Sequence, residues 1–88
     1  PWGVDRVDAD ESWTCSQATY GHVAIIDTGI DSDHPDLTPN LGYGASWVGS
    51  SWNDDNGHGT HCAGIVGADY NSYGVTGVAP SANLHAAK

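Results

Sequence analysis

The sequence contains no Phe and no Met, and its 88 residues include only two Lys or Arg, namely Arg6 and Lys88. Twelve residues are Gly, so few large apolar side chains remain to build a hydrophobic core. A chain of this length forms at most one small domain, which buries only about 60–65% of its unfolded surface and is marginally stable. We therefore expect that the fold depends on something besides its own core, or that the chain is part of a larger domain.

The shortage of basic residues leaves eleven Asp and Glu almost unopposed, which gives a formal net charge of −9. Nucleic acids and anionic membranes are excluded as partners, because the chain has almost nothing with which to neutralise phosphates. Ten of the acidic residues are Asp, and they are spread along the chain. Such a composition suits a secreted protein, a calcium binder or a protein adapted to high salt, and it does not separate these three.

Long apolar runs and abundant cysteine are also lacking. No stretch approaches the roughly 18 consecutive apolar residues that predict a membrane-spanning helix. The two cysteines, Cys15 and Cys62, allow at most one internal disulfide, which excludes a disulfide-dense miniprotein. A bridge between them is disfavoured, because their segments have no evident reason to meet.

Three segments carry the pattern of an α/β fold. The run His22–Asp27 is short, apolar and rich in β-branched residues, and it predicts a buried strand that ends at Asp27. Gly57–Ala68 is rich in small residues and predicts a helix that needs close tertiary packing, because each helical Gly costs about 1 kcal/mol relative to Ala. A further strand is predicted at Ala82–Lys88. This order of strand, helix and strand favours parallel pairing.

Weaker signals predict the remaining elements. Residues 1–7 are expected to form an extended arm. The spacing of Asp8 and Glu11 matches a capping box and predicts a short helix over residues 8–15. The other expectations are turns over residues 31–57, with a short strand near Ala45–Val48, and a loop over residues 69–77.

The triplet Asp27-Thr28-Gly29 after an apolar run is typical of two different protease classes. In a small retroviral-type aspartic protease it would present the catalytic Asp of a homodimer. That class needs strands and hairpins after the triplet, whereas this sequence continues into the small-residue helix. The helix also contains two histidines, His58 and His61, for which an aspartic protease has no use.

The other class explains both segments together. The motifs "DTGIDSDHPDL" (27–37), "NGHGTHCAGIVGA" (56–68) and "YGVTGVAPSANLHAAK" (73–88) follow one another in an order and spacing that resembles the subtilisin-like serine protease (subtilase) family. The Cys after "HGTH" is similar to the proteinase K branch of that family. The resemblance implies an α/β fold with a subtilisin-like parallel sheet and flanking helices. Residues 1–88 would form the N-terminal, incomplete portion of the peptidase domain.

The resemblance also implies catalytic roles for two residues. A serine nucleophile needs a neutral imidazole to accept its proton and a buried carboxylate to orient that imidazole. By resemblance, Asp27 is the orienting carboxylate and His58 is the general base. Asp27 closes a strand at the carboxyl edge of the predicted sheet, where open α/β folds place their sites.

The serine nucleophile, the third member of the Asp-His-Ser catalytic triad, is missing from this chain. The nucleophile of the family lies in a Gly-Thr-Ser-x-Ala motif, and neither Ser72 nor Ser81 has that context. The chain alone is therefore expected to be inactive, with the remainder of the peptidase domain as its partner and proteins or peptides as the substrates of the whole.

Three neighbouring residues have competing interpretations. Thr28 either hydrogen-bonds near the Asp27 carboxylate or simply forms a turn. His61 lacks the Glu of an H-E-x-x-H zinc helix, so a packed, hydrogen-bonded role is favoured over metal binding. Cys62 is interpreted as a buried structural thiol rather than a nucleophile, because a cysteine protease brings its Cys and His together from distant segments.

A calcium site is expected by resemblance. Calcium prefers oxygen ligands from carboxylates, amide side chains and backbone carbonyls. In subtilases one such site uses the Asp after His-Pro, here Asp36, and the loop after the His-bearing helix. The loop ligands implied are the side chain of Asn71 and the backbone carbonyls of Asp69, Tyr73 and Val75.

The sequence thus predicts a secreted serine endopeptidase that uses calcium as a structural cofactor and of which this chain carries the Asp and His. The alternative left open is a non-catalytic, calcium-binding acidic module related to subtilases.

Overall fold

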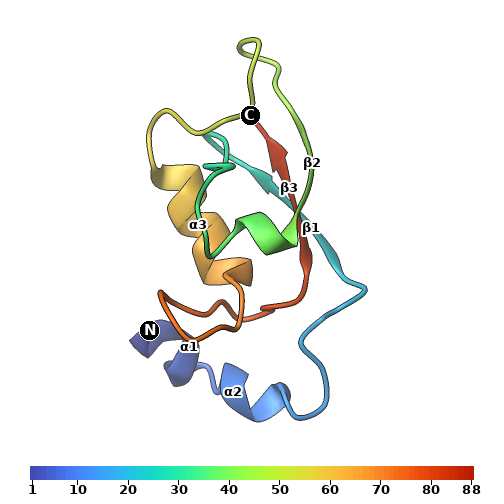
Figure 1. Cartoon of the computed structure of the whole chain (residues 1–88), viewed down its shortest axis with the longest axis vertical. Coiled ribbons are helices and arrows are strands. Elements are labelled where there is room, and N and C mark those ends of the chain that lie inside the picture. The colour runs from blue at the N-terminus through green and yellow to red at the C-terminus, as the bar shows by residue number, and fades with distance from the viewer.

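The computed structural model describes all residues of the chain, 1–88. A small parallel sheet forms its centre, in the order β1-β3-β2, with helices beside it (Figure 1). The elements are α1 (Trp2–Arg6), α2 (Ala9–Ser12), β1 (His22–Ile26), a 3-10 turn (Thr38–Asn40), β2 (Leu41–Ala45), α3 (His58–Gly67) and β3 (Asn83–Ala87). The predicted α/β fold with parallel strands is confirmed.

The core lies between α3 and one face of the sheet. Its buried apolar residues come from β1, β3, α3 and the segment after β1. Small residues on α3 allow the close approach: a Cβ on Gly67 would lie 3.0 Å from the nearest methyl of Leu84. The Gly-rich helix α3 has a weak intrinsic helix propensity and was predicted to need close tertiary packing. The structure shows such packing.

The opposite face of the sheet is open in this chain. Strand β1 was expected to be buried, yet Ile25 alone among its residues is buried and Ile26 is 84% exposed. The reason is that strand side chains alternate between the two faces, and α3 covers only one of them. On β2, Tyr43 is exposed in the same way.

Two predictions about the N-terminal segment were wrong. Residues 1–7 are not an extended arm, because Trp2–Arg6 form a helical turn whose Val4 is buried. The capping box is not formed either: Asp8 adopts the left-handed conformation, with φ 58°, and its side chain makes no capping hydrogen bond. This conformation separates α1 from α2. The predicted short helix is present, although it spans only Ala9–Ser12.

The remaining boundaries differ modestly from expectation. Strand β2 begins at Leu41 and ends at Ala45, earlier than predicted, because it pairs with β3 in a register that places Ala45 opposite Ala87. Residues 69–77 form a loop, as predicted. No helix of the fold has the length and apolar character needed to span a bilayer.

Candidate active site

The site begins where β1 ends. Asp27 follows the last residue of β1, and its backbone N–H donates to the carbonyl of Ala87 at the end of β3. His58 is the first residue of α3, which packs against the same sheet. The carboxyl edge of the sheet and the start of the helix therefore bring together two residues that are 31 positions apart.

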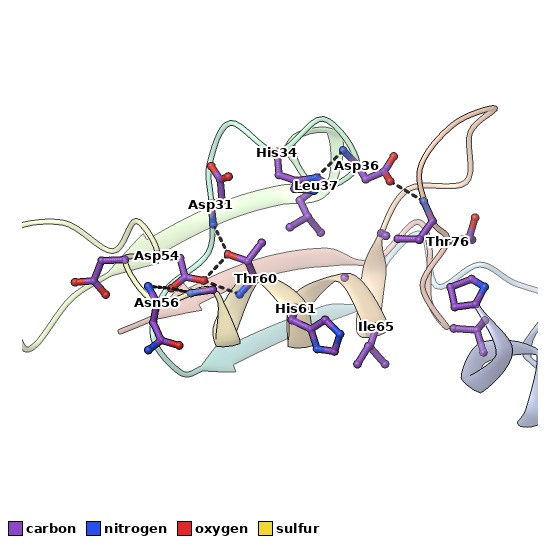
Figure 2. A pocket seen from close by; sticks show the side chains of 17 residues that line it. Asp31, His34, Asp36, Leu37, Asp54, Asn56, Thr60, His61, Ile65 and Thr76 are labelled. Atoms are coloured by element: carbon purple, nitrogen blue, oxygen red, sulfur yellow. Dashed lines mark hydrogen bonds between the residues drawn. The ribbon is translucent and has the colours of Figure 1, made fainter.

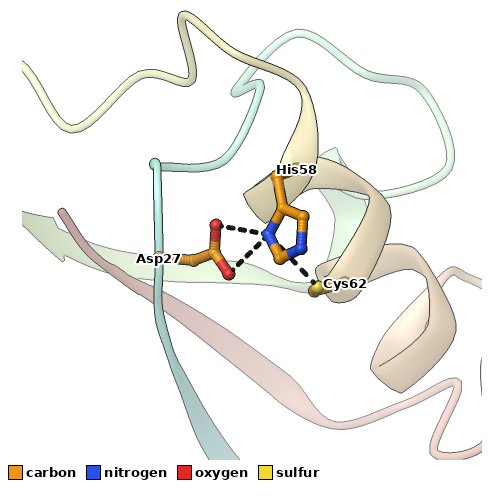
Figure 3. Close-up of side chains that lie close together, drawn as sticks. All are labelled: Asp27, His58 and Cys62. Carbon is orange, nitrogen blue, oxygen red and sulfur yellow. Dashed lines mark hydrogen bonds and ion pairs between the residues drawn. The ribbon is translucent and has the colours of Figure 1, made fainter.

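Asp27 and His58 form a direct contact. The Nδ1 atom of His58 lies 2.8 Å from both carboxylate oxygens of Asp27 (Figure 3). Because an ionised carboxylate only accepts hydrogen bonds, this contact requires a proton on Nδ1, and in the neutral imidazole Nε2 is then the acceptor nitrogen. The His58 side chain is 66% exposed, whereas that of Asp27 is 18% exposed. A partly buried carboxylate that is hydrogen-bonded to an exposed imidazole is the arrangement in which a carboxylate orients a general base.

The environment of Asp27 keeps it ionised. The hydrogen bond from His58 lowers the pKa of Asp27 most, and the Thr28 backbone N–H, 2.7 Å from Oδ1, lowers it further. Partial burial acts in the opposite direction and is outweighed. Thr28 therefore does hydrogen-bond to the Asp27 carboxylate, although it does so through its backbone.

Cys62 completes a cluster around the imidazole. Its Sγ atom lies 3.8 Å from Nδ1 of His58, one helical turn further along α3 (Figure 3). The prediction of a buried thiol was too strong, because Cys62 is only half-buried at the edge of the helix–sheet contact. Cys62 and Cys15 are not bridged to each other.

The prediction of a packed, hydrogen-bonded His61 was wrong. His61 is exposed, and no side-chain hydrogen bond involves its ring. It lies three residues after His58 on α3 and lines a cavity of about 680 Å³ formed by α3, α1 and the loops around residues 31–37 and 54–57 (Figure 2). Neither Asp27 nor His58 lines that cavity, so it is separate from the pair.

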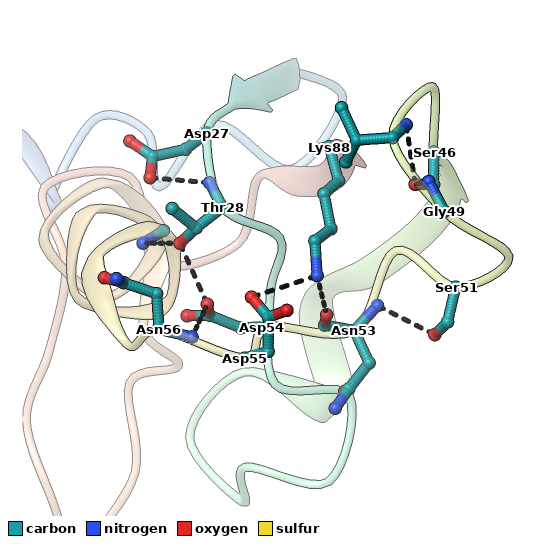
Figure 4. A network of polar contacts seen from close by, with 12 residues as sticks. Asp27, Thr28, Ser46, Gly49, Ser51, Asn53, Asp54, Asp55, Asn56 and Lys88 are labelled. Carbon is teal, nitrogen blue, oxygen red and sulfur yellow. Dashed lines mark hydrogen bonds and ion pairs between the residues drawn. The ribbon is translucent and has the colours of Figure 1, made fainter.

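Asp54 is a member of the site that sequence reasoning missed. Its carboxylate accepts hydrogen bonds from the start of α3 and from the hydroxyl of Thr28 (Figure 4). The sequence carried no specific signal for this role, because Asp54 lies three residues before the N-cap Gly57, outside the position where a capping Asp is expected.

The structure also gathers residues of the expected calcium site around Asp36. Asp36 is 2% exposed, and its two carboxylate oxygens accept hydrogen bonds from Nδ2 of Asn71 and the backbone N–H of Val75, each at 2.8 Å. The backbone N–H of Asp69 donates to the carbonyl of Asp36, also at 2.8 Å. Tyr73 lies in the same loop, and its backbone N–H donates to Oδ1 of Asn71.

The loop is fitted closely to this carboxylate. Gly74 has φ +67°, and a Cβ at this position would overlap the Asp36 carboxylate. The side-chain hydrogen bond from Asn71, followed by the one from Val75, lowers the pKa of Asp36, although burial acts in the opposite direction. A carboxylate, an amide oxygen and backbone carbonyls are the hard oxygen ligands that suit calcium. In this structure the Asp36 oxygens accept from N–H groups, and the Asn71 oxygen accepts from the N–H of Tyr73. Asn71 must turn its amide to present oxygen, because its nitrogen now faces Asp36.

The chain is similar in sequence to known proteins over most of its length. The sequence model of the Subtilase family matches residues 21–88. Subtilisin BL of Lederbergia lenta is 52% identical over 91 residues, covering 100% of this chain and 33% of that protein. Subtilisin E of Bacillus subtilis (strain 168) is 47% identical over 95 residues, covering 100% of this chain and 24% of that protein. Minor extracellular protease Epr of the same strain is 43% identical over 88 residues, covering 99% of this chain and 14% of that protein.

The chain belongs to the subtilase family, whose named relatives are subtilisins and alkaline or extracellular proteases. It spans a third or less of the length of the relatives described above.

Proposed function

We propose that the complete protein is a serine endopeptidase that cleaves proteins or peptides, with Asp27 and His58 as two members of its triad. The observation that carries this proposal is the 2.8 Å contact between the Asp27 carboxylate and Nδ1 of His58. Membership of a family whose relatives are named as proteases supports it.

Each residue has a defined task in this mechanism. His58 accepts the proton of the serine hydroxyl at Nε2 while the oxygen attacks the scissile carbonyl, and it later donates that proton to the leaving amine. Asp27 holds the proton on Nδ1, keeps the ring oriented and stabilises the imidazolium that forms. No serine hydroxyl of residues 1–88 is hydrogen-bonded to His58, so the nucleophile comes from the remainder of the peptidase domain. The exposed apolar side chains on the open sheet face, Ile26 and Tyr43, provide a surface for that remainder.

Calcium is proposed as a structural cofactor of the complete protein. Asp36 and the side chain of Asn71 would hold it, together with backbone carbonyls of Asp69, Tyr73 and Val75. The ion would fix the loop against Asp36 and would take no part in bond cleavage. The burial of Asp36 beneath this loop supports the proposal.

We further propose that the protein is secreted. The acidic composition suits an extracellular protein, and one relative is named as an extracellular protease.

Class-specific inhibitors test the protease proposal. The complete protein is incubated with a serine-directed fluorophosphonate or with pepstatin, and cleavage of a casein substrate is followed. We expect the fluorophosphonate to abolish cleavage and to label the protein covalently, and pepstatin to have no effect. Absence of cleavage and of labelling in the folded, calcium-loaded protein would instead favour the non-catalytic calcium-binding module.

A further inference from the structure

The carboxylate of Asp54 lies at the centre of the connection between the two candidate catalytic segments. Its Oδ1 accepts hydrogen bonds from the Thr28 hydroxyl and from the backbone N–H groups of Asn56 and Gly57, at 2.8, 2.9 and 3.0 Å. Its Oδ2 accepts from the backbone N–H and the hydroxyl of Thr60. The donors Gly57 and Thr60 lie on either side of His58 in the chain. Another donor, Thr28, is the neighbour of Asp27 (Figure 4).

Only a carboxylate can make this set of contacts. Both oxygens are used as acceptors, whereas the amide of Asn has one acceptor oxygen and a nitrogen that donates. Burial alone would raise the pKa of Asp54, but the hydrogen bonds from Gly57, Thr60 and Asn56 outweigh it and hold the pKa well below its usual range. The side chain therefore stays a charged, fully used acceptor at neutral pH.

Thr28 links this carboxylate to the helix. The hydroxyl of Thr28 donates to Asp54 and accepts from the backbone N–H of Gly59 at 2.9 Å, while the backbone N–H of Thr28 donates to Asp27. A continuous chain of hydrogen bonds thus runs from the Asp27 carboxylate to the residues before and after His58. A change at Asp54 removes its contact with Thr28 and its contacts on both sides of His58 at once.

We propose that Asp54, acting through Thr28, is a positioning residue that sets the contact between Asp27 and His58. The inference rests on the proposed function, because its consequence for rate requires that the pair be catalytic. Asp54 touches neither member of the pair, so its effect is on their relative placement. A displacement of about 1 Å in a reacting group costs on the order of 100-fold in rate, even when its cause is remote from the chemistry.

The chain offers a matched control one residue away. Asp55 carries the same charge, is 79% exposed and forms a salt bridge with Lys88 at 3.1 Å, but no hydrogen bond joins its side chain to α3 or Thr28. Asp54→Asn and Asp55→Asn therefore remove the same charge from the same turn, and only the first removes the network. Thr28→Val removes the hydroxyl that bonds to Asp54 and Gly59, whereas Thr28→Ser keeps a hydroxyl at this position.

The test measures kcat and KM for a peptide substrate, the melting temperature, and the NMR signal of the His58 Nδ1 proton in the complete protein. We expect Asp54→Asn to lower kcat about 10- to 100-fold with little change in KM, measured well below its melting temperature. Thr28→Val should lower kcat as well, and Thr28→Ser should recover most of that loss. The Nδ1 proton signal should shift or broaden in Asp54→Asn and Thr28→Val, and should stay in place in Asp55→Asn.

Two results would overturn the inference. One is a wild-type kcat and an unmoved Nδ1 proton in Asp54→Asn. The other is a lower melting temperature in Asp54→Asn while kcat, KM and the Nδ1 signal of its folded fraction stay unchanged, which would leave Asp54 a purely structural helix cap. If the wild-type protein cleaves no peptide, the proposed function fails, and the Nδ1 signal alone then decides whether Asp54 positions His58.

Discussion

Gly59 on α3 lies directly against the carbonyl of Gly29, so close that a Cβ on Gly59 would overlap the Gly29 oxygen. This backbone contact allows the start of α3 to approach the end of β1, and with it His58 to approach Asp27. At Gly64, five residues further along the same helix, an added Cβ meets nothing within 4 Å.

Gly59→Ala is therefore expected to separate the helix start from the Asp27 segment, lowering both the melting temperature and kcat. Gly64→Ala, the matched control, should stabilise the protein by up to about 1 kcal/mol through helix propensity. Thermal denaturation and peptide cleavage measure both effects. Equal behaviour of the two variants would show that the Gly59–Gly29 contact is not required.

Asp27→Asn should lower kcat about 10⁴-fold while the protein stays folded. The amide of Asn donates a hydrogen bond to Nδ1, which places the imidazole proton on Nε2, where the serine proton must be accepted. Steady-state kinetics and circular dichroism test this pair of expectations. A loss of less than tenfold would remove Asp27 from the orienting role.

The two histidines of α3 are expected to differ sharply. His58→Ala should abolish nearly all turnover, because no other group can accept the serine proton. His61→Ala should change neither kcat nor the melting temperature by much, because the ring is exposed and makes no hydrogen bond. Loss of activity in His61→Ala equal to that in His58→Ala would contradict the assignment.

Asp36 should make stability depend on pH in the acid range. Its pKa is lowered in the folded state by Asn71 and Val75, so its stabilising effect is fully present above the unfolded value of about 3.9 and is lost as pH falls through the folded value. In the presence of chelator, Asp36→Asn should melt below wild type at pH 6, and the gap should narrow below about pH 4. Asp33→Asn, an exposed neighbour, is the control; a gap that does not depend on pH would contradict the linkage.

Calcium should raise the melting temperature of the complete protein relative to chelator. An ion that binds only the folded state stabilises it by about 2.7 kcal/mol at a hundredfold excess over Kd. Asp36→Ala should remove the shift, and Asp33→Ala should keep it. If Asp36→Ala retained the whole shift, Asp36 would not be a ligand.

Local pattern was enough to predict the elements that carry the site. The apolar run before Asp27 and the small-residue helix from His58 follow from chain periodicity, and their order implies parallel strands, which the structure contains. The resemblance to subtilases implied that Asp27 and His58 act as a pair, and the structure places them in contact.

Other features were predicted wrongly, because residue spacing specifies neither the backbone conformation at one position nor the contacts between distant segments. The capping-box spacing of Asp8 and Glu11 predicted a helix start, but the left-handed backbone at Asp8 prevents the cap. His61 and Cys62 are adjacent on one helix and both were predicted to be packed, yet the core contacts only the side of α3 on which Cys62 lies.

Asp54 shows most clearly the difference between what the local sequence predicts and what the tertiary fold decides. By sequence it is one of two adjacent acidic residues in a turn, and nothing local distinguishes it from Asp55. The tertiary fold brings Thr28 and the first turn of α3 to Asp54 and leaves Asp55 in solvent. The sequence by itself thus determined which residues could perform the chemistry. The packing of α3 against the end of β1 decided which carboxylate holds them in place, because a carboxylate that is partly withdrawn from water is stable only where enough donors converge on it.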